Sequence, residues 1–209
     1  MPIHEPGGAE VLAAAAAAER LLRPALDLDW TAPVPGLDFT ASTVTAHIAA
    51  ALAWYSFDLW GGTQDISALD LKVDTGAAPD HLLGTVLAAA RSLAAGVSAA
   101  PPEVRGFHPA GAADASGFAA MGCDEVLIHA DDAARGLGLP FTPDAGLAAL
   151  VLARLFPWHE PGDDPWQILR WANGRTELPG RPSQRGWQWH CRPLADWDGT
   201  VPPQREEGS

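Results

Sequence analysis

Four stretches of the sequence repeat apolar residues at helical spacing, and Pro or Gly separates one stretch from the next. The clearest covers about 81–96, where the apolar positions are Leu82, Leu83, Val86, Leu87, Ala90 and Leu93. The same periodicity predicts helices at about 9–22 and 44–60, and another from Asp114 or Ser116 to about Gly136. Shorter helices are expected at about 144–156 and 165–173. The pattern predicts an all-α protein, an antiparallel four-helix bundle with extra short helices.

The last part of the sequence differs in composition from the rest. Beyond Gly174 it is rich in Pro, Gly, Arg and Trp. We therefore expect a helical bundle over 1–174 and a C-terminal extension over 175–209 that packs on it. The run at 186–192 is typical of a strand or of an extended tail, and 65–74 of a short extended segment. The last eight residues are expected to be disordered.

Charge and cysteine content narrow the class of protein. The net charge is −13, which argues against binding to nucleic acid or to an anionic membrane surface. Two cysteines among 209 residues exclude a disulfide framework. The N-terminus lacks the pattern of a signal peptide, and no window approaches the about 18–20 apolar residues of a spanning helix. These features predict a cytoplasmic protein without a membrane span.

The pair Glu125 and His129 is the strongest functional signal. Residues four apart share one face of a helix, so this carboxylate and imidazole would project side by side. One helix can offer two ligands to a metal ion in this way. His47, in another apolar helix, is the obvious third donor. Two imidazoles and one carboxylate with an open position form a familiar catalytic zinc arrangement.

Simpler explanations compete with the metal hypothesis. A single His on an apolar helix is more often a hydrogen-bonded core or edge residue than a ligand. A Glu and a His four residues apart are more often a solvated pair. Glu125 lies among Val126, Leu127 and Ile128, however. Burying an unpaired carboxylate there would cost several kcal/mol.

Two blocks of sequence carry a family resemblance. One covers 30–59 and places His47 seven residues before Trp54-Tyr55; the other runs from Gly117 through Glu125, His129 and Asp132 to Gly138. The chain resembles the DinB-like superfamily, specifically the maleylpyruvate isomerase N-terminal domain group of mycothiol-dependent enzymes. The resemblance implies a four-helix bundle whose metal is held by residues matching His47, Glu125 and His129. It also implies that this metal binds a thiolate or water. About 35 residues follow Gly174, too few for the second domain of the isomerase.

Other side chains are weaker candidates for the site. His108 could act as a general acid or base over the pocket, or lie on the surface. Asp132 could orient His129, or contact Arg135 or solvent. Asp131 is expected to be exposed. Trp54 would share the face of His47, where core packing is the alternative to ligand contact.

The remaining candidates are Cys123, two residues before Glu125 in the same expected helix, and residues near the C-terminus. Arg175, with Arg181 and Arg185, could meet a carboxylate or cofactor, or offset acidic surface. Cys123 is expected to be a buried, inert thiol. The tryptophans from Trp158 to Trp197 would fasten the tail to the bundle, or form an aromatic wall over the pocket or a dimer contact.

Together these features favour an enzyme that uses a divalent metal, with zinc as the first candidate. It would activate mycothiol or another small thiol, or water, for transfer to or isomerisation of a small electrophile. One alternative is a non-catalytic bundle that binds a small molecule or a second copy of itself as a homodimer. Another is a biosynthetic isomerase or cyclase that uses no thiol.

Overall fold

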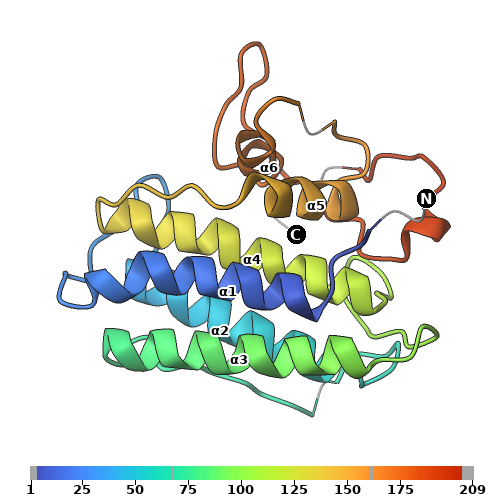
Figure 1. Cartoon of the computed structure of the whole chain (residues 1–209), viewed down its shortest axis with the longest axis horizontal. Coiled ribbons are helices and arrows are strands. Elements are labelled where there is room, and N and C mark those ends of the chain that lie inside the picture. The colour runs from blue at the N-terminus through green and yellow to red at the C-terminus, as the bar shows by residue number, and fades with distance from the viewer. Residues whose placement is uncertain (1–3, 67, 161, 204–209) are drawn as a thin grey trace.

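The computed structural model describes residues 4–66, 68–160 and 162–203, and it confirms the all-α prediction (Figure 1). Every predicted helix is present within a few residues of its expected bounds. The helices are α1 Gly8–Leu22, α2 Ala41–Asp58, α3 Pro79–Ala99, α4 Ala115–Gly136, α5 Ala145–Leu155 and α6 Pro165–Ala172. Short 3-10 turns follow at Arg23–Ala25 and Leu194–Asp196.

The first four helices form the bundle. α1 and α2 each pack against both α3 and α4, so α3 and α4 are the shared walls of the core. α5 packs on α4 and also against α6, which places both short helices outside the bundle on the α4 side (Figure 1). α4 is therefore covered from two directions, and most of its residues are buried.

A glycine brings α4 unusually close to two neighbours. A Cβ atom at Gly122 would lie 2.5 Å from Leu93 Cδ2 of α3 and 3.2 Å from Leu52 Cδ2 of α2. A larger residue would force at least the Leu93 side chain to shift. Because Glu125 follows one turn later, this contact helps to fix the distance between Glu125 and the side chains of α2.

Local hydrogen bonds and a proline define the starts of two bundle helices. Thr40 caps α2: its hydroxyl accepts the Thr43 N–H at 3.2 Å, and the Thr43 hydroxyl accepts the Thr40 N–H at 2.7 Å. This reciprocal pair satisfies two backbone donors at once. α3 begins at Pro79, which suits the first position of a helix, and Asp80 lies in its first turn.

The C-terminal segment is an extended tail docked on the helices. The described residues contain no β-strand, so the β alternative for 186–192 is wrong, and the described part of 65–74 contains neither a helix nor a paired strand. His190 N–H nevertheless bonds to the Leu155 carbonyl at 2.8 Å, which ties the tail to the end of α5. The disorder expected for the last eight residues falls mostly on 204–209, outside the described residues.

Arg154 of α5 joins three parts of the chain. Its side chain is only 1% exposed. The guanidinium pairs with Asp114 at 2.7 Å and with Glu5 at 3.2 Å, and it donates to the carbonyls of His190 at 3.1 Å and Cys191 at 3.3 Å. One buried cation thus connects the N-terminal segment, the start of α4 and the tail.

One helix of the bundle has the length and composition of a membrane span. α3 passes that test, contrary to the expectation that no window would approach it. Half of the apolar stretch is buried against the other helices. A core helix of a bundle passes the same test, and the buried positions of α3, such as Leu82, Leu83 and Leu93, form its inward face.

Candidate metal centre

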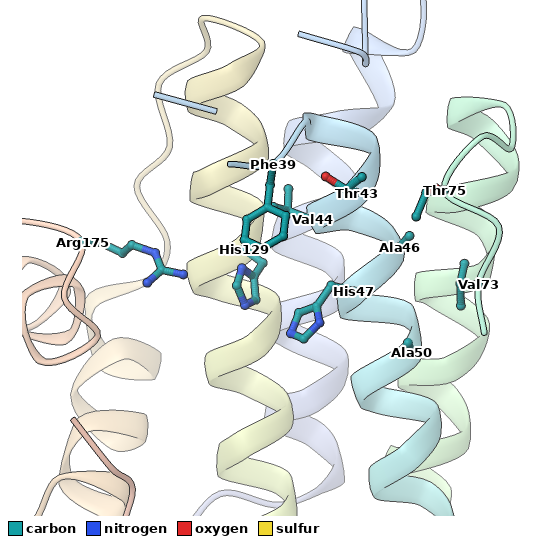
Figure 2. A pocket seen from close by; sticks show the side chains of 10 residues that line it. All are labelled: Phe39, Thr43, Val44, Ala46, His47, Ala50, Val73, Thr75, His129 and Arg175. Atoms are coloured by element: carbon teal, nitrogen blue, oxygen red, sulfur yellow. The ribbon is translucent and has the colours of Figure 1, made fainter. Parts of the chain in front are cut away.

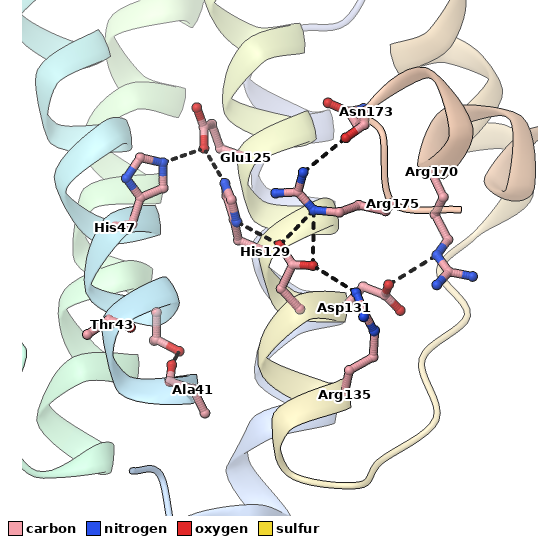
Figure 3. A network of polar contacts seen from close by, with 12 residues as sticks. Ala41, Thr43, His47, Glu125, His129, Asp131, Arg135, Arg170, Asn173 and Arg175 are labelled. Carbon is pink, nitrogen blue, oxygen red and sulfur yellow. Dashed lines mark hydrogen bonds and ion pairs between the residues drawn. The ribbon is translucent and has the colours of Figure 1, made fainter. Parts of the chain in front are cut away.

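Two imidazoles, from two different helices, converge on one carboxylate oxygen (Figure 3). His47 Nε2 of α2 lies 3.1 Å from Glu125 Oε2, and His129 Nε2 of α4 lies 3.2 Å from the same oxygen. The ligand atoms of all three lie within 4.8 Å of one another. The two imidazole rings meet edge to face with centroids 4.7 Å apart. The three residues expected to bind metal are therefore neighbours in space.

The three side chains are buried to different degrees. Glu125 is 9% exposed and His129 is 18% exposed, whereas His47 is 55% exposed. Burial opposes ionisation of Glu125, but the hydrogen bonds with His129 and His47 outweigh burial and hold the pKa of Glu125 well below its usual range. The carboxylate is thus ionised, and it lies on the inner side of the site.

Tyr55 holds the second oxygen of the same carboxylate. Its hydroxyl donates to Glu125 Oε1 at 2.9 Å. Burial, together with the charge of Glu125, raises the pKa of Tyr55 well above its usual value, so the phenol keeps its proton and remains a donor. Glu125 Oε2 is left facing the two imidazoles.

Asp132 and Arg175 support His129 from behind. His129 Nδ1 lies 3.0 Å from Asp132 Oδ2, and Arg175 Nε lies 3.1 Å from both oxygens of Asp132. Burial lowers the pKa of His129, but the bonds to Asp132 and Glu125 raise it to about 9. A carboxylate on the far ring nitrogen orients the imidazole and leaves Nε2 for the site.

The donor set fits a small divalent ion. In a tetrahedral zinc site with ligands at about 2.0–2.1 Å, neighbouring ligand atoms are about 3.3–3.4 Å apart. The two nitrogen–oxygen separations, 3.1 Å and 3.2 Å, are close to that value. Two neutral imidazoles and a carboxylate would leave at least one position open for a further ligand.

Two cavities meet at the imidazoles of His47 and His129. The outer pocket has a volume of about 400 Å³ and is bounded mainly by α2 and the loops that flank it (Figure 2). The inner cavity, of about 180 Å³, lies between α4 and the C-terminal segment. His47, His129 and Arg175 line both cavities, and Glu125 lines the inner one.

Comparison with known families finds one matching family model. A family model described as the mycothiol maleylpyruvate isomerase N-terminal domain matches residues 11–134, more than half of the chain. The chain belongs to this family. No curated protein and no solved structure matches the chain. The matched residues of the mycothiol maleylpyruvate isomerase N-terminal domain include His47, Glu125 and His129, whereas Arg175 and the tail lie beyond them.

The weaker candidates differ in whether they contact the proposed ligands or line a cavity. Asp132 contacts His129 and Arg175 and is fully buried, so it supports the site without facing either cavity. Trp54 and His108 line neither cavity. His108 instead lies in a loop, where its Nδ1 accepts the Ala110 N–H at 3.1 Å and its ring lies 6.0 Å from that of Tyr55.

The structure also tests the expected burial of Asp131, Cys123 and the tryptophans. The expectation of an exposed Asp131 was wrong: it is 5% exposed, and it pairs with Arg170 of α6 at 3.1 Å. Cys123 is fully buried, as expected, and burial raises the pKa of its thiol. Among the tryptophans, Trp166 and Trp171 are buried and fasten α6, whereas Trp187 and Trp189 line the inner cavity.

Tyr55 was missed, and the neighbouring Trp54 was chosen instead. Trp54 follows His47 by seven residues and so lies on its face of α2. His47, however, lies at the edge of the bundle, and the buried face of α2 runs through Ile48, Leu52 and Tyr55. Spacing counted from Ile48 would have identified Tyr55.

Proposed function

We propose that this protein is a metal-dependent enzyme in which His47, Glu125 and His129 hold one divalent ion, with zinc as the first candidate. The observation that supports this most is the convergence of both Nε2 atoms on Glu125 Oε2, at 3.1 Å and 3.2 Å. The site would act on a small electrophile with a low-molecular-weight thiol, such as mycothiol, or water as the nucleophile.

A bound ion of this kind lowers the pKa of a thiol or water ligand toward neutrality. The chain's own residues prepare the ligands. Tyr55 fixes the Glu125 carboxylate, and Asp132 fixes the ring of His129. Both cavities reach His47 and His129, so a reactant can approach the open side of the site from the outer pocket.

The nucleophile would have to come from outside the chain. Cys123 and Cys191 are both fully buried. Burial raises the pKa of Cys191 to about 11 and that of Cys123 further, so neither thiol supplies a thiolate at neutral pH. A free thiol is favoured over water by the description of the family, which names mycothiol.

Metal analysis of the purified protein tests the metal site. We expect about one zinc or other divalent ion per chain in the wild type, and loss of it in His129→Ala. His81→Ala is the matched control, because this imidazole is exposed on α3 and lines neither cavity. No metal in the wild type, or full metal content in His129→Ala, would reject the proposal.

Cobalt substitution then separates a thiol from water. A thiolate that binds Co²⁺ produces a charge-transfer band in the near ultraviolet. We expect this band when mycothiol is added to the cobalt protein, and turnover of a small electrophile in its presence. An unchanged spectrum with intact cobalt would rule out a thiolate ligand and leave water activation or simple ligand binding as the alternatives.

A further inference from the structure

The outer pocket has an apolar wall beside a polar floor. Its wall is formed by Phe39, Val44, Ala46, Ala50 and Val73, and its floor by the imidazoles (Figure 2). Three of these wall residues lie on α2 within four residues of His47, so the apolar surface begins directly beside the ligand atoms. A molecule that reaches the candidate metal from the outer pocket passes along this wall.

The size and rim of the pocket suit a small organic molecule. A volume of about 400 Å³ lies in the usual range of ligand sites, about 300–1,000 Å³. Phe39 at the rim is 55% exposed, and Val73 comes from the loop between α2 and α3. Apolar surface that is left open beside a reactive centre favours a ligand that covers it.

The charges at the pocket are already matched. Arg175 extends from the C-terminal segment toward the pocket (Figure 2), but its Nε is bonded to both oxygens of Asp132. Its Nη1 donates to the Asn173 carbonyl at 3.0 Å. The cation is therefore committed to supporting Asp132, and the body of a ligand in this pocket gains most when it is uncharged.

The inner cavity has a more polar lining than the outer pocket. It is smaller, about 180 Å³, and its lining includes Asp124, Glu125, Asn173 and Arg175 beside the rings of Trp187 and Trp189. This side has room for a small polar reactant, and the outer side for an apolar one.

We propose that the substrate of this site has an uncharged apolar body, which lies in the outer pocket, and a polar head that reaches the metal centre. This inference rests on the proposed metal-dependent function. It adds the substrate class: compounds with a short alkyl chain or a single ring rather than compact, highly charged acids.

A series of metal-binding probes with growing apolar bodies tests this class. The probes are straight-chain hydroxamic acids from acetohydroxamic to hexanohydroxamic acid, added to the cobalt-substituted protein, with the visible Co²⁺ bands as the readout of binding. A hydroxamate does not require the thiol step. If each methylene is buried on the wall, affinity should rise by about threefold to fourfold per methylene.

Ala50→Leu fills the pocket and should reduce this gain to less than twofold per methylene. Ala88→Leu is the matched control, since Ala88 is exposed on α3 away from the pocket, and it should keep the full gain. Val73 lies in a loop, so Val73→Ser makes the wall more polar without disturbing a helix. This variant should also reduce the gain in affinity per methylene.

The outcomes distinguish the two proposals. A protein that binds cobalt but shows equal affinity along the series, or a gain that persists in both Ala50→Leu and Val73→Ser, overturns the assignment of the substrate class alone. A protein that binds no cobalt overturns the metal-dependent function and this inference with it.

Discussion

The hydroxyl of Tyr55 donates a hydrogen bond to Glu125 Oε1 at 2.9 Å, while both imidazoles lie next to Oε2. The two oxygens of one carboxylate therefore have separate partners. Tyr55 lies on the same helix as His47, so α2 contributes both a ligand candidate and the group that orients the carboxylate of α4. We infer that Glu125 would bind a metal through one oxygen.

Tyr55→Phe should release Glu125 Oε1 and allow it to approach the metal. We expect the cobalt spectrum to shift toward higher coordination and metal affinity to fall by about 10- to 100-fold, the usual effect of removing a partner of a ligand. Competition with a chelator measures the affinity. Ser56→Ala is the control, because the Ser56 hydroxyl bonds to the Leu52 carbonyl at 2.8 Å, within its own helix. Equal spectra for both variants would contradict this role.

Arg175→Gln should weaken metal binding through Asp132 and His129. Without the guanidinium, Asp132 keeps a distant pair with Arg135 at 3.4 Å and is free to turn away from His129. We expect about a 10-fold loss of metal affinity by chelator competition. Arg181→Gln should bind metal like the wild type, since the Arg181 guanidinium lies over the Trp171 ring at 5.4 Å.

Arg154→Ala should destabilise the whole fold. Removing the cation leaves Asp114, Glu5 and two tail carbonyls without their buried partner, and breaking such a pair costs about 3–5 kcal/mol. The midpoint of urea unfolding reports the loss. Arg91→Ala, on the exposed face of α3, should stay within about 0.5 kcal/mol of the wild type. A similar midpoint for the two variants would show that the tail does not depend on this cation.

Both cysteines should be unreactive in the native protein. Cys123 and Cys191 are fully buried, and burial raises the pKa of each thiol. Titration with an aromatic disulfide reagent should give a negligible signal in buffer and two thiols per chain in denaturant. Rapid modification of either one in buffer would show that its surroundings open in solution.

Asp58→Asn should flatten the stability profile in mild acid. Burial and the nearby charge of Asp65 raise the pKa of Asp58 to about 6. The folded state therefore holds this proton more tightly than the unfolded state, and stability falls as pH rises from about 4 to 6. At pH 7.5 Asp58 is charged in the folded state, and this charge is unfavourable beside Asp65, so the neutral variant should be more stable. The gain should be limited to about 1 kcal/mol, because solvent screens a half-buried group. Unfolding midpoints of the wild type and the variant at pH 4 and 7.5 measure this difference. An equal gain in stability at both pH values would count against the prediction.

Local patterns predicted the helices and the three proposed metal ligands. The helices follow from periodicity and from Pro and Gly between them, which act within a few residues. Glu125 and His129 share a helix, so their contact also follows from local geometry. Their contact with His47 depends on how α2 meets α4. The family resemblance supplied that, and the close packing at Gly122 helps to enforce it.

Contacts between distant segments were not predictable in the same way. Asp131 looked like a surface residue because its partner, Arg170, lies 39 positions later in a separate helix. Arg175 was a candidate for ligand binding, yet its guanidinium supports Asp132. The tail has no helical or strand period, so its composition left an aromatic wall over the pocket as one alternative among three, and only the structure places Trp187 and Trp189 in the lining of the inner cavity.

The unequal exposure of the three proposed ligands has a consequence for how the site would be loaded. Glu125 and His129 lie on one rigid helix, and their positions are held by Tyr55 and Asp132. His47, with more than half of its side chain exposed, is the ligand with freedom to rotate. An incoming ion would first meet the prearranged pair and then be captured as His47 swings in. Loading and release would therefore share a single gate, and the lifetime of the bound ion would depend on the rotamer of His47.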